Sequence, residues 1–402
     1  MTKLAIDGGR PVRGTPFPPW PFYDADAIES AMLPLKSGKV NYWTGTIGRE
    51  FEDAYAAYVG TDYAVALMNG SVALELALIA LGIEPGDEVI VASRTFIASA
   101  GCVALRSGHP VIADVDKDSQ NITAETIADV LTPRTKGIIA VHLAGWPCDM
   151  DPILALARDR GLWVVEDCAQ AHGAKYKGRQ VGSMGDVAAF SFCQDKIITT
   201  GGEGGMVTTN NHDLWEKMWS LKDHGKSFDA VYHRNHTPGF RWLHESFGTN
   251  GRMTEIQAAL GFDQLKKLAV WLKIRRQNAT FLTEAFSQIH GLRVAVPPAD
   301  ISHAYYKYYT FVEPDQLKPD WSRDRIMQSI MAEGIPSGSG SCSEIYLEKA
   351  FDRTPFRPDG RLPVAQRLGE TSLIFMVHPT MTLDDMDDVV KAVQKVMRVA
   401  IR

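Results

Sequence analysis

Lys196 lies in a segment whose residue types suit covalent chemistry. A β-type run over residues 187–192 gives way to polar residues, to this lysine, and then to four glycines within the five positions 201–205. Glycine tolerates positive φ, so such a segment can turn sharply beside a bound group. A lysine amine that is desolvated, or that lies near other cations, can form a Schiff base. The alternative is a solvated surface lysine.

Asp167 ends a buried-type strand expected at residues 162–167, and Gln170 follows it three residues later. Ligands of open α/β sheets collect at the carboxyl ends of strands. A buried carboxylate at such a place can pair with a protonated ring nitrogen, as pyridoxal phosphate requires when it acts as an electron sink. Gln170 can then donate an amide hydrogen to the phenolic oxygen of that cofactor. The alternative role for Asp167 is a helix N-cap.

A phosphate site is expected at Gly70 and Ser71. These residues follow a strand expected at residues 64–67 and open a helical run rich in alanine and leucine. Backbone N–H groups at a helix N-terminus bind phosphate with the help of the macrodipole. The alternative is a structural helix with Ser71 as its N-cap. After the next strand, at residues 88–92, Phe96 can stack on a flat heteroaromatic ring or belong to the core.

In their order and spacing, these four segments resemble the DegT/DnrJ/StrS family of pyridoxal-phosphate sugar aminotransferases. The resemblance extends over nearly the whole chain, and its motifs together are far more specific than a single glycine motif. It includes the further segments at residues 86–91, 113–116, 142–150, 222–225 and 248–259.

The resemblance implies a role for each residue that would face the cofactor ring. Lys196 corresponds to the lysine that forms the Schiff base, and Asp167 to the partner of the pyridinium nitrogen. Gln170 matches the residue that contacts the phenolic oxygen. Phe96 stands where an aromatic residue stacks on the ring.

The resemblance also implies a phosphate cradle that two subunits share. Ser191 and the turn formed by Gly70 and Ser71 correspond to the contacts from the same chain. Asn250 lies in a Gly-x-Asn-x-Arg segment, and it corresponds to the residue that reaches the phosphate of the neighbouring subunit. We therefore expect a homodimer with shared active sites.

The sequence departs from the usual family pattern at a few positions. Asn69 precedes Gly70 and Ser71 where Ser-Gly-Thr is common, Gly251 replaces an aromatic residue, and Gly202 is an extra glycine before Glu203. None of these changes removes a group that the chemistry requires.

Four side chains are further candidates for contacts with the substrate. Arg94 stands in the turn before Phe96, and His172 can orient the donor carboxylate or fill space under Asp167. Arg241 lies in a segment without periodicity at residues 231–247, which suggests a loop over the active site or a solvated polar loop. His378 can close the site from the C-terminal part of the chain, with an ordinary turn histidine as the alternative.

The resemblance implies a reaction that moves an amino group from L-glutamate or L-glutamine to a keto sugar, usually one linked to a nucleotide. The amino sugar would be made for surface polysaccharide or a secondary metabolite. Some relatives instead aminate cyclitol ketones such as scyllo-inosose, or make an aromatic amine, and residues 4–13 look somewhat like the cyclitol branch. A non-catalytic regulator that binds pyridoxal phosphate would be expected to lack Lys196, Asp167 or Ser191, and all three are present.

The composition is that of a cytoplasmic enzyme. A formal net charge of −6 without a lysine or arginine run argues against nucleic acid as a partner. No segment approaches the roughly 20 apolar residues of a membrane span, and the first residues lack the apolar core of a signal peptide. The cysteines at positions 102, 148, 168, 193 and 342 suggest neither a disulfide framework nor a metal site.

The elements that position these residues are those of an α/β fold, and the resemblance implies the type I fold of pyridoxal-phosphate enzymes. Short strands at residues 64–67, 88–92, 111–114, 137–142, 162–167, 187–192 and 205–209 alternate with helices such as 72–81 and 124–131. This pattern predicts a mostly parallel seven-stranded sheet between helices. A long helix from about residue 253 leads to a smaller α+β domain with a β-type stretch at 305–312 and helices at 323–333 and 383–399. A chain of 402 residues is long for one core, so we expect domains at 1–265 and 266–402.

Overall fold

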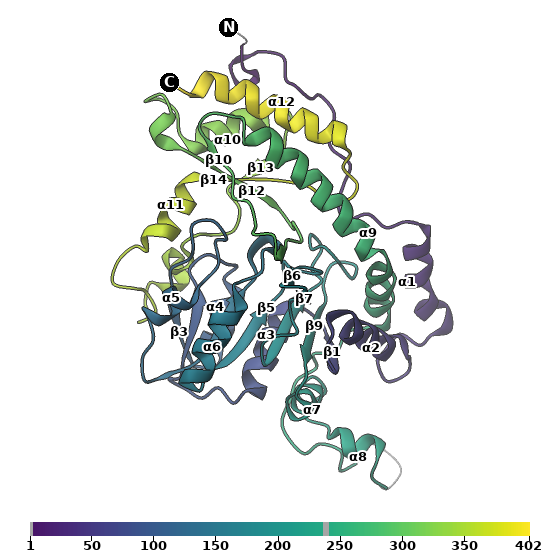
Figure 1. Ribbon diagram of the computed structural model, residues 1–402. Coiled ribbons are helices and arrows are strands. Elements are labelled where there is room, and N and C mark those ends of the chain that lie inside the picture. Colours follow the sequence, from purple (N-terminus) through teal and green to yellow (C-terminus); the bar gives the residue numbers. More distant parts are fainter. Residues whose placement is uncertain (1–2, 236–240) are drawn as a thin grey trace.

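The large sheet of the computed structural model has seven strands in the order β1-β9-β8-β5-β4-β2-β3 (Figure 1). The structure describes residues 3–235 and 241–402. Strands β2, β3, β4, β5 and β8 are mutually parallel, while β9 runs antiparallel to both β8 and β1. The predicted fold class is therefore confirmed. The strands are β1 (Tyr63–Leu67), β2 (Glu88–Ala92), β3 (His109–Ala113), β4 (Thr135–Val141), β5 (Trp163–Asp167), β8 (Val187–Ser191) and β9 (Gly205–Thr209).

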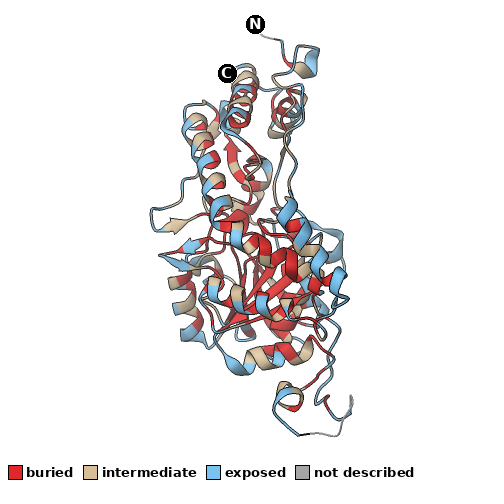
Figure 2. Ribbon diagram, turned by 90° about the vertical axis from the view of Figure 1, so that its right-hand side faces the viewer, coloured by how far each residue is buried: buried red, intermediate tan, exposed pale blue. Residues whose placement is uncertain are grey.

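Both faces of this sheet are apolar and covered. Along β8, Val187 and Ala189 join one buried cluster, whereas Ala188 and Phe190 join another. Successive side chains of a strand point to opposite faces, so the two clusters are the two sides of the sheet. Figure 2 shows these strands as mostly buried. The helices of this part are α2 (Ile47–Val59), α3 (Gly70–Ala80), α4 (Ala98–Leu105), α5 (Ala124–Ala128), α6 (Met150–Arg160) and α7 (His212–Leu221).

Two predicted elements are three residues shorter in the structure than in the prediction. Helix α5 ends at Ala128 instead of residue 131, because the chain has to leave the helical conformation before Pro133. Strand β12 (Tyr308–Val312) begins three residues later than expected, because Tyr305 has a φ of 50° and interrupts the extended backbone.

Helix α9 (Glu255–Phe286) connects the large sheet to a second, smaller sheet. Its first turn has a capping box, in which Thr254 and Gln257 satisfy each other's backbone N–H groups. The smaller sheet is antiparallel in the order β10-β12-β14-β13 and packs with the C-terminal helices. The division at residues 265 and 266 falls inside α9 and stays a prediction. The elements of this part are β10 (Leu292–Arg293), β13 (Ser337–Gly338), β14 (Ser372–Phe375), α10 (Arg323–Ala332), α11 (Pro363–Thr371) and α12 (Leu383–Ala400).

The N-terminal residues pack against the C-terminal part of the chain. Leu4 belongs to the buried cluster around α12, and the guanidinium of Arg13 lies 2.9 Å from carboxylate oxygens of both Asp385 and Asp388. Glu333 accepts the backbone N–H of Ala5 at 2.8 Å. The first segment therefore ties the small sheet to α1 (Ala25–Ser37), which lies along α9 (Figure 1).

The described residues of the segment at 231–247 lie in and beside α8 (Phe228–Tyr232), at the end of Figure 1 opposite the small sheet. Residues 236–240 of this predicted loop lie outside the described residues. A further three-stranded sheet consists of β6 (Lys175–Tyr176), β7 (Arg179–Gln180) and β11 (Ile301–Ser302). Among the residues that the structure describes, no helix is both long and apolar enough to cross a bilayer.

Candidate active site

The carboxyl ends of β1, β2, β5 and β8 meet at one edge of the large sheet, and the loops that follow them line a cavity of about 850 Å³. The small sheet covers this cavity from the other side, through residues of β12, β14 and the loop after β13. Seven predicted cofactor-binding residues line the cavity. They are Gly70, Ser71, Phe96, Asp167, Gln170, Ser191 and Lys196.

Lys196 is held by its backbone in the loop after β8. Its N–H donates to the Cys193 carbonyl at 3.0 Å, and its own carbonyl accepts the indole N–H of Trp20 at 2.9 Å. Its Nζ lies 4.9 Å from the centre of the Tyr306 ring. The backbone of Lys196 is therefore fixed at the cavity, and the Tyr306 ring lies next to its amine.

Asp167 lies in the same cavity, at the end of β5. Its Oδ2 accepts a hydrogen bond from the Ser99 hydroxyl at 2.8 Å, and its Oδ1 accepts the Ala169 N–H at 3.2 Å. Burial raises the pKa of this carboxyl group, although the hydrogen bond from Ser99 acts in the opposite direction. No helix begins at Asp167, so the alternative role as an N-cap does not apply. The charged form of a buried carboxylate of this kind is stabilised most by a cationic partner.

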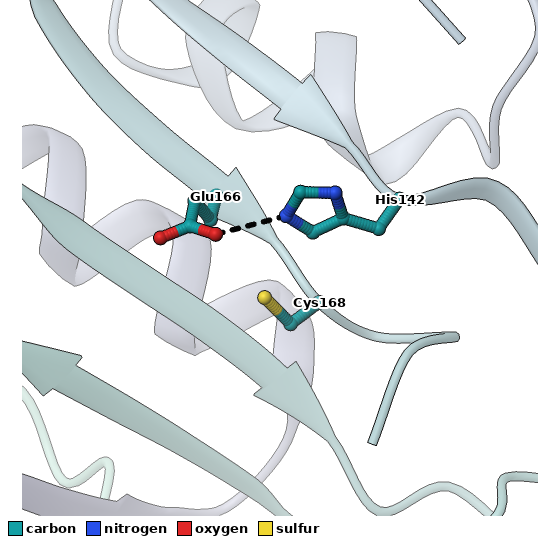
Figure 3. Close-up of side chains that lie close together, drawn as sticks. All are labelled: His142, Glu166 and Cys168. Atoms are coloured by element: carbon teal, nitrogen blue, oxygen red, sulfur yellow. Dashed lines mark hydrogen bonds and ion pairs between the residues drawn. The ribbon is translucent and has the colours of Figure 1, made fainter. Parts of the chain in front are cut away.

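A buried polar cluster fixes the strand that carries Asp167. The Cys148 N–H donates to Nδ1 of His142, so the proton on Nε2 is donated to Glu166, 3.0 Å away (Figure 3). Glu166 also accepts three backbone N–H groups of residues 182–185. Burial alone would raise the pKa of Glu166, but the hydrogen bond from His142 brings it below its ordinary value. Because both ring nitrogens of His142 and both carboxylate oxygens of Glu166 already have protein partners, these two residues have a structural role beside Cys168.

The start of α3 forms a cradle for an anion. Asn69, and not Ser71, is its N-cap, because the helix begins at Gly70 and the Asn69 side chain accepts the Val72 N–H at 2.9 Å. The backbone N–H groups of Gly70 and Ser71 donate to no atom of the described residues. A Cβ at Gly70 would lie 2.7 Å from Cβ of Ser191, so only glycine fits between α3 and the end of β8.

Gln170 and Phe96 complete the walls of the cavity. The side-chain oxygen of Gln170 accepts the Ala144 N–H at 2.8 Å, which leaves its amide nitrogen to donate elsewhere. Phe96 is 68% exposed although it lies at the cavity, so it does not belong to the core. An exposed ring at this place can cover the face of a flat ligand.

His172 does not line the cavity. The Tyr55 hydroxyl lies 2.7 Å from its Nδ1, and the Ser191 carbonyl lies 2.8 Å from its Nε2. The carbonyl can only accept, so Nε2 carries the proton and Nδ1 accepts from Tyr55. Burial lowers the pKa of His172 to about 4, so the ring is neutral at pH 7. Both ring nitrogens are used inside the protein, and the residue positions the backbone of Ser191.

The other predicted substrate contacts also lie away from the cavity wall. Arg94 is buried and donates to the Ser372 hydroxyl at 2.9 Å. His378 accepts or donates to Thr380 at 2.8 Å, and burial lowers its pKa to about 3. Arg241 and Asn250 are exposed and do not line this chain's cavity.

Sequence reasoning missed three residues of this site. Ser99 holds Asp167, while Tyr306 and Lys307 come from the loop before β12 and line the cavity more than 100 positions after Lys196 in the chain. The sequence around Tyr306 and Lys307 reads only as a β-type stretch. No local signal shows which of its side chains reach the large sheet.

These residues fit pyridoxal phosphate. When the cofactor is bound, Asp167 would pair with its ring nitrogen, the free amide of Gln170 would donate to its phenolic oxygen, Lys196 would hold its aldehyde carbon, and Phe96 would cover its ring. The unpaired N–H groups at Gly70 and Ser71 suit its phosphate.

Comparisons with known proteins find aminotransferases and a perosamine synthase that match most of the chain. GDP-perosamine synthase of Caulobacter vibrioides is 39% identical over 364 residues, which cover 88% of this chain and 92% of that protein. The L-glutamine:2-deoxy-scyllo-inosose aminotransferase of Streptoalloteichus tenebrarius is 33% identical, with 98% of this chain and 97% of that protein covered. The crystal structure of an aminotransferase from Psychrobacter cryohalolentis is 54% identical and has a TM-score of 0.93, with 95% of this chain and 99% of that chain covered.

The family comparison gives the same result over most of the chain. Residues 23–394 match the DegT/DnrJ/EryC1/StrS aminotransferases, whose members depend on pyridoxal 5′-phosphate. The protein is therefore an enzyme of the transaminase type, and the chain belongs to the DegT/DnrJ/EryC1/StrS aminotransferase family.

Proposed function

We propose that this enzyme moves an amino group from L-glutamate or L-glutamine to a keto sugar that is carried on a nucleotide. The product is an amino sugar for surface polysaccharide or a secondary metabolite. The observation that carries the proposal is that Lys196 and Asp167 line one cavity at the carboxyl edge of the sheet. The similarity to GDP-perosamine synthase supports a sugar acceptor.

The catalytic roles follow from the positions of the side chains. When bound, the cofactor supplies an electron sink for the bonds at the donor α-carbon. Asp167 holds the proton on the ring nitrogen, and Ser99 holds Asp167 in place. Lys196, once released from the cofactor, is the base that takes the proton from the donor α-carbon. The same amine can then deliver a proton to C4′ of the cofactor.

The remaining cavity residues hold the cofactor in this proposal. Gly70, Ser71 and Ser191 bind the phosphate, because they lie at the helix N-terminus and at the adjoining strand end. Phe96 covers the ring, and the amide of Gln170 donates to the phenolic oxygen.

A homodimer with shared sites accounts for the exposed apolar side chains in the segment after α8 and on α1. Phe247 is fully exposed and Trp242 is 85% exposed. On α1, Ile28 and Leu33 are each more than half exposed. Large exposed apolar groups of this kind mark contact surfaces. Asn250, which is exposed three positions after Phe247, then reaches the phosphate site of the second subunit.

The cysteines support a reducing compartment such as the cytoplasm. All five are free thiols, and three of them, Cys102, Cys148 and Cys168, are buried.

A cyclitol ketone is the alternative acceptor, and an amino-aromatic product is a further one. The similarity to the scyllo-inosose aminotransferase favours the cyclitol among these. A regulator that binds the cofactor without turnover is disfavoured, because Lys196, Asp167 and Ser191 all line the cavity.

The test is a two-stage reaction with the purified protein and its cofactor. In the first stage, L-glutamate or L-glutamine is added and the change in cofactor absorbance identifies the donor. After the donor is removed, nucleotide-linked keto sugars and scyllo-inosose are added separately, and the acceptor is the compound that restores the original spectrum. Restoration by scyllo-inosose alone would replace the sugar proposal with the cyclitol alternative.

A further inference from the structure

A second amine faces the cavity besides Lys196. Lys307 lies just before β12, lines the cavity, and has a side chain that is 16% exposed. Its Nζ lies 4.7 Å from the centre of the Tyr306 ring, and Nζ of Lys196 lies 4.9 Å from the same centre. The two amines therefore share one aromatic side chain as a neighbour.

Positive charge exceeds negative charge around Lys307. The carboxylate of Asp195 lies 3.8 Å from Nζ of Lys307, but it also accepts the hydrogen bond of the Tyr306 hydroxyl. The other contact of this amine is the Met376 sulfur at 3.3 Å. Asp195 is about half exposed, so its pairing with the lysine is partly screened by water.

Arg275 adds a second cation behind this lysine. It is fully buried on α9, and its Nη1 donates to the Tyr305 carbonyl at 3.2 Å. Its Nε and Nη2 atoms have no hydrogen-bond partner, and among the described residues no carboxylate forms an ion pair with it. Burial lowers the pKa of Lys307 to about 8, and the positive charge of Arg275 acts in the same direction. A buried cation without a counter-ion is costly, so this corner favours an anion.

We propose that Lys307 binds the α-carboxylate of the amino donor, with Arg275 as the positive charge behind it. The assignment rests on the proposed function, because it requires an amino acid that reacts at Lys196. The α-carboxylate is attached to the reacting carbon itself, so it must lie next to the amine that takes the proton from this carbon. Lys307 is a cavity-lining cation near Lys196, since the two amines lie 4.7 Å and 4.9 Å from the centre of the Tyr306 ring. In the proposed function Gly70, Ser71 and Ser191 bind the phosphate of the cofactor, which leaves the charge of Lys307 for the donor.

The experiment compares Lys307→Met and Lys307→Arg with the wild type. Lys307→Met keeps the length of the side chain and removes its charge, whereas Lys307→Arg keeps a charge. Lys273→Met is the matched control, because Lys273 is an exposed lysine on α9 near Arg275. For each protein with its cofactor, the rate of the absorbance change is measured over a range of donor concentrations. This gives the half-saturating concentration and the limiting rate separately.

The expected result is a half-saturating concentration about 10- to 100-fold higher in Lys307→Met for both L-glutamate and L-glutamine, the range for loss of one hydrogen bond to a charged group. The limiting rate changes less, and Lys307→Arg and Lys273→Met stay within a few-fold of the wild type. L-Isoglutamine has an amide in place of the α-carboxylate, so it is a poor donor for the wild type and is insensitive to Lys307→Met. Calorimetric binding of 2-oxoglutarate, which has the carboxylate and no amine, weakens by the same factor in Lys307→Met.

Two results would overturn the assignment, and they are distinguishable. If the wild type reacts with its donor and Lys307→Met has the same half-saturating concentration, the assignment alone fails. An effect with L-glutamate and isoglutamine but not with L-glutamine would place the side-chain carboxylate on Lys307, and this also contradicts the assignment. If the wild type with bound cofactor reacts with no donor, the proposed function fails, and the assignment fails with it.

Discussion

Asp167 and its hydrogen-bond partners give the site its electrostatic character at the scale of single residues. The carboxylate is buried, receives one hydroxyl and one backbone N–H, and has no arginine or lysine in an ion pair among the described residues. Burial therefore raises its pKa, and in our proposal the protonated ring nitrogen of the cofactor restores the charged form. The hydroxyl of Ser99 would orient the carboxylate toward that partner.

Replacing Ser99 tests this positioning role. Ser99→Ala removes a hydrogen bond to a charged group, and such bonds contribute about 1.5–3 kcal/mol. We expect the limiting rate of the donor step to fall about tenfold or more. The spectral pH titration of the bound cofactor shifts as well, because its ring nitrogen loses a well-placed carboxylate. Ser99→Thr retains the hydroxyl and is expected to restore both readouts, whereas an unchanged titration in Ser99→Ala would contradict the role.

His172 predicts a pH dependence of stability. Its pKa is about 4 in the folded protein against an ordinary value of 6.5, because burial disfavours the charged ring. As the pH falls below 6.5, the unfolded chain takes up the proton first, so folding becomes less favourable. The stabilisation is fully present above pH 6.5 and falls by about 1.4 kcal/mol per pH unit on the way to pH 4.

The measurement is the unfolding free energy of the wild type and of His172→Gln between pH 7 and pH 4. The variant is less stable at pH 7 and has a shallower slope below pH 6.5. His290→Gln is the control, because His290 is exposed and its replacement should leave the slope unchanged. Equal slopes in wild type and His172→Gln would show that the ring is not held neutral.

At the scale of elements, the site depends on where strands end and helices begin. The predicted strands lie within two residues of β1, β2, β3, β4, β5, β8 and β9, because hydrophobic runs bounded by glycine and polar residues define buried parallel strands well. The residues at those strand ends were accordingly predicted. Tyr306 and Lys307 were not, since they reach the cavity only through the packing of the small sheet against the large one. The packing of the two sheets also explains why the sequence does not show that Arg94 and His378 lie away from the cavity wall. Arg94 donates to Ser372 of the small sheet, and His378 forms a hydrogen bond with Thr380.

The contact between α3 and β8 gives a prediction at this scale. Gly70→Ala places a Cβ 2.7 Å from Cβ of Ser191, so the start of the helix has to move away from the strand. Overpacking of this kind costs about 1–3 kcal/mol. We expect the dissociation constant of pyridoxal phosphate to rise about tenfold or more, as measured by equilibrium dialysis, because the phosphate cradle opens.

Gly101→Ala is the matched control for that variant. Gly101 lies inside α4, and a Cβ there has no neighbour within 4 Å. Alanine in a helix interior is favoured over glycine by up to about 1 kcal/mol, so this variant should bind the cofactor normally and be at least as stable as the wild type. Normal cofactor affinity in Gly70→Ala would contradict the proposed cradle.

At the scale of the whole molecule, the chain contains only part of what the proposed site needs. The cavity holds Lys196, Asp167 and the helix terminus of α3, but Asn250 is exposed outside it. The exposed apolar side chains of α1 and of Phe247 lack cover in the single chain. A second copy of the chain supplies both the cover and the missing contact to the phosphate in our proposal.

Complementation between subunits tests the shared site. Lys196→Ala and Asn250→Asp each abolish or strongly reduce activity in the homodimer, the second because a carboxylate repels the phosphate. A heterodimer purified through two different affinity tags contains one site with both wild-type residues, so it should recover about half of the wild-type activity per dimer. No recovery would mean that both residues act in the same chain, and a monomeric wild type would exclude the shared site altogether.

The most direct test of the central claim is borohydride reduction of the holoenzyme followed by peptide mass spectrometry, with and without prior addition of L-glutamate or L-glutamine. Without donor, we predict that the reduced cofactor is found on the peptide that contains Lys196. After the correct donor, the label should disappear from this peptide, because the amino group has moved to the cofactor and freed the lysine. Absence of label from Lys196, or label that neither donor removes, would contradict the account of this protein as an aminotransferase that works through Lys196.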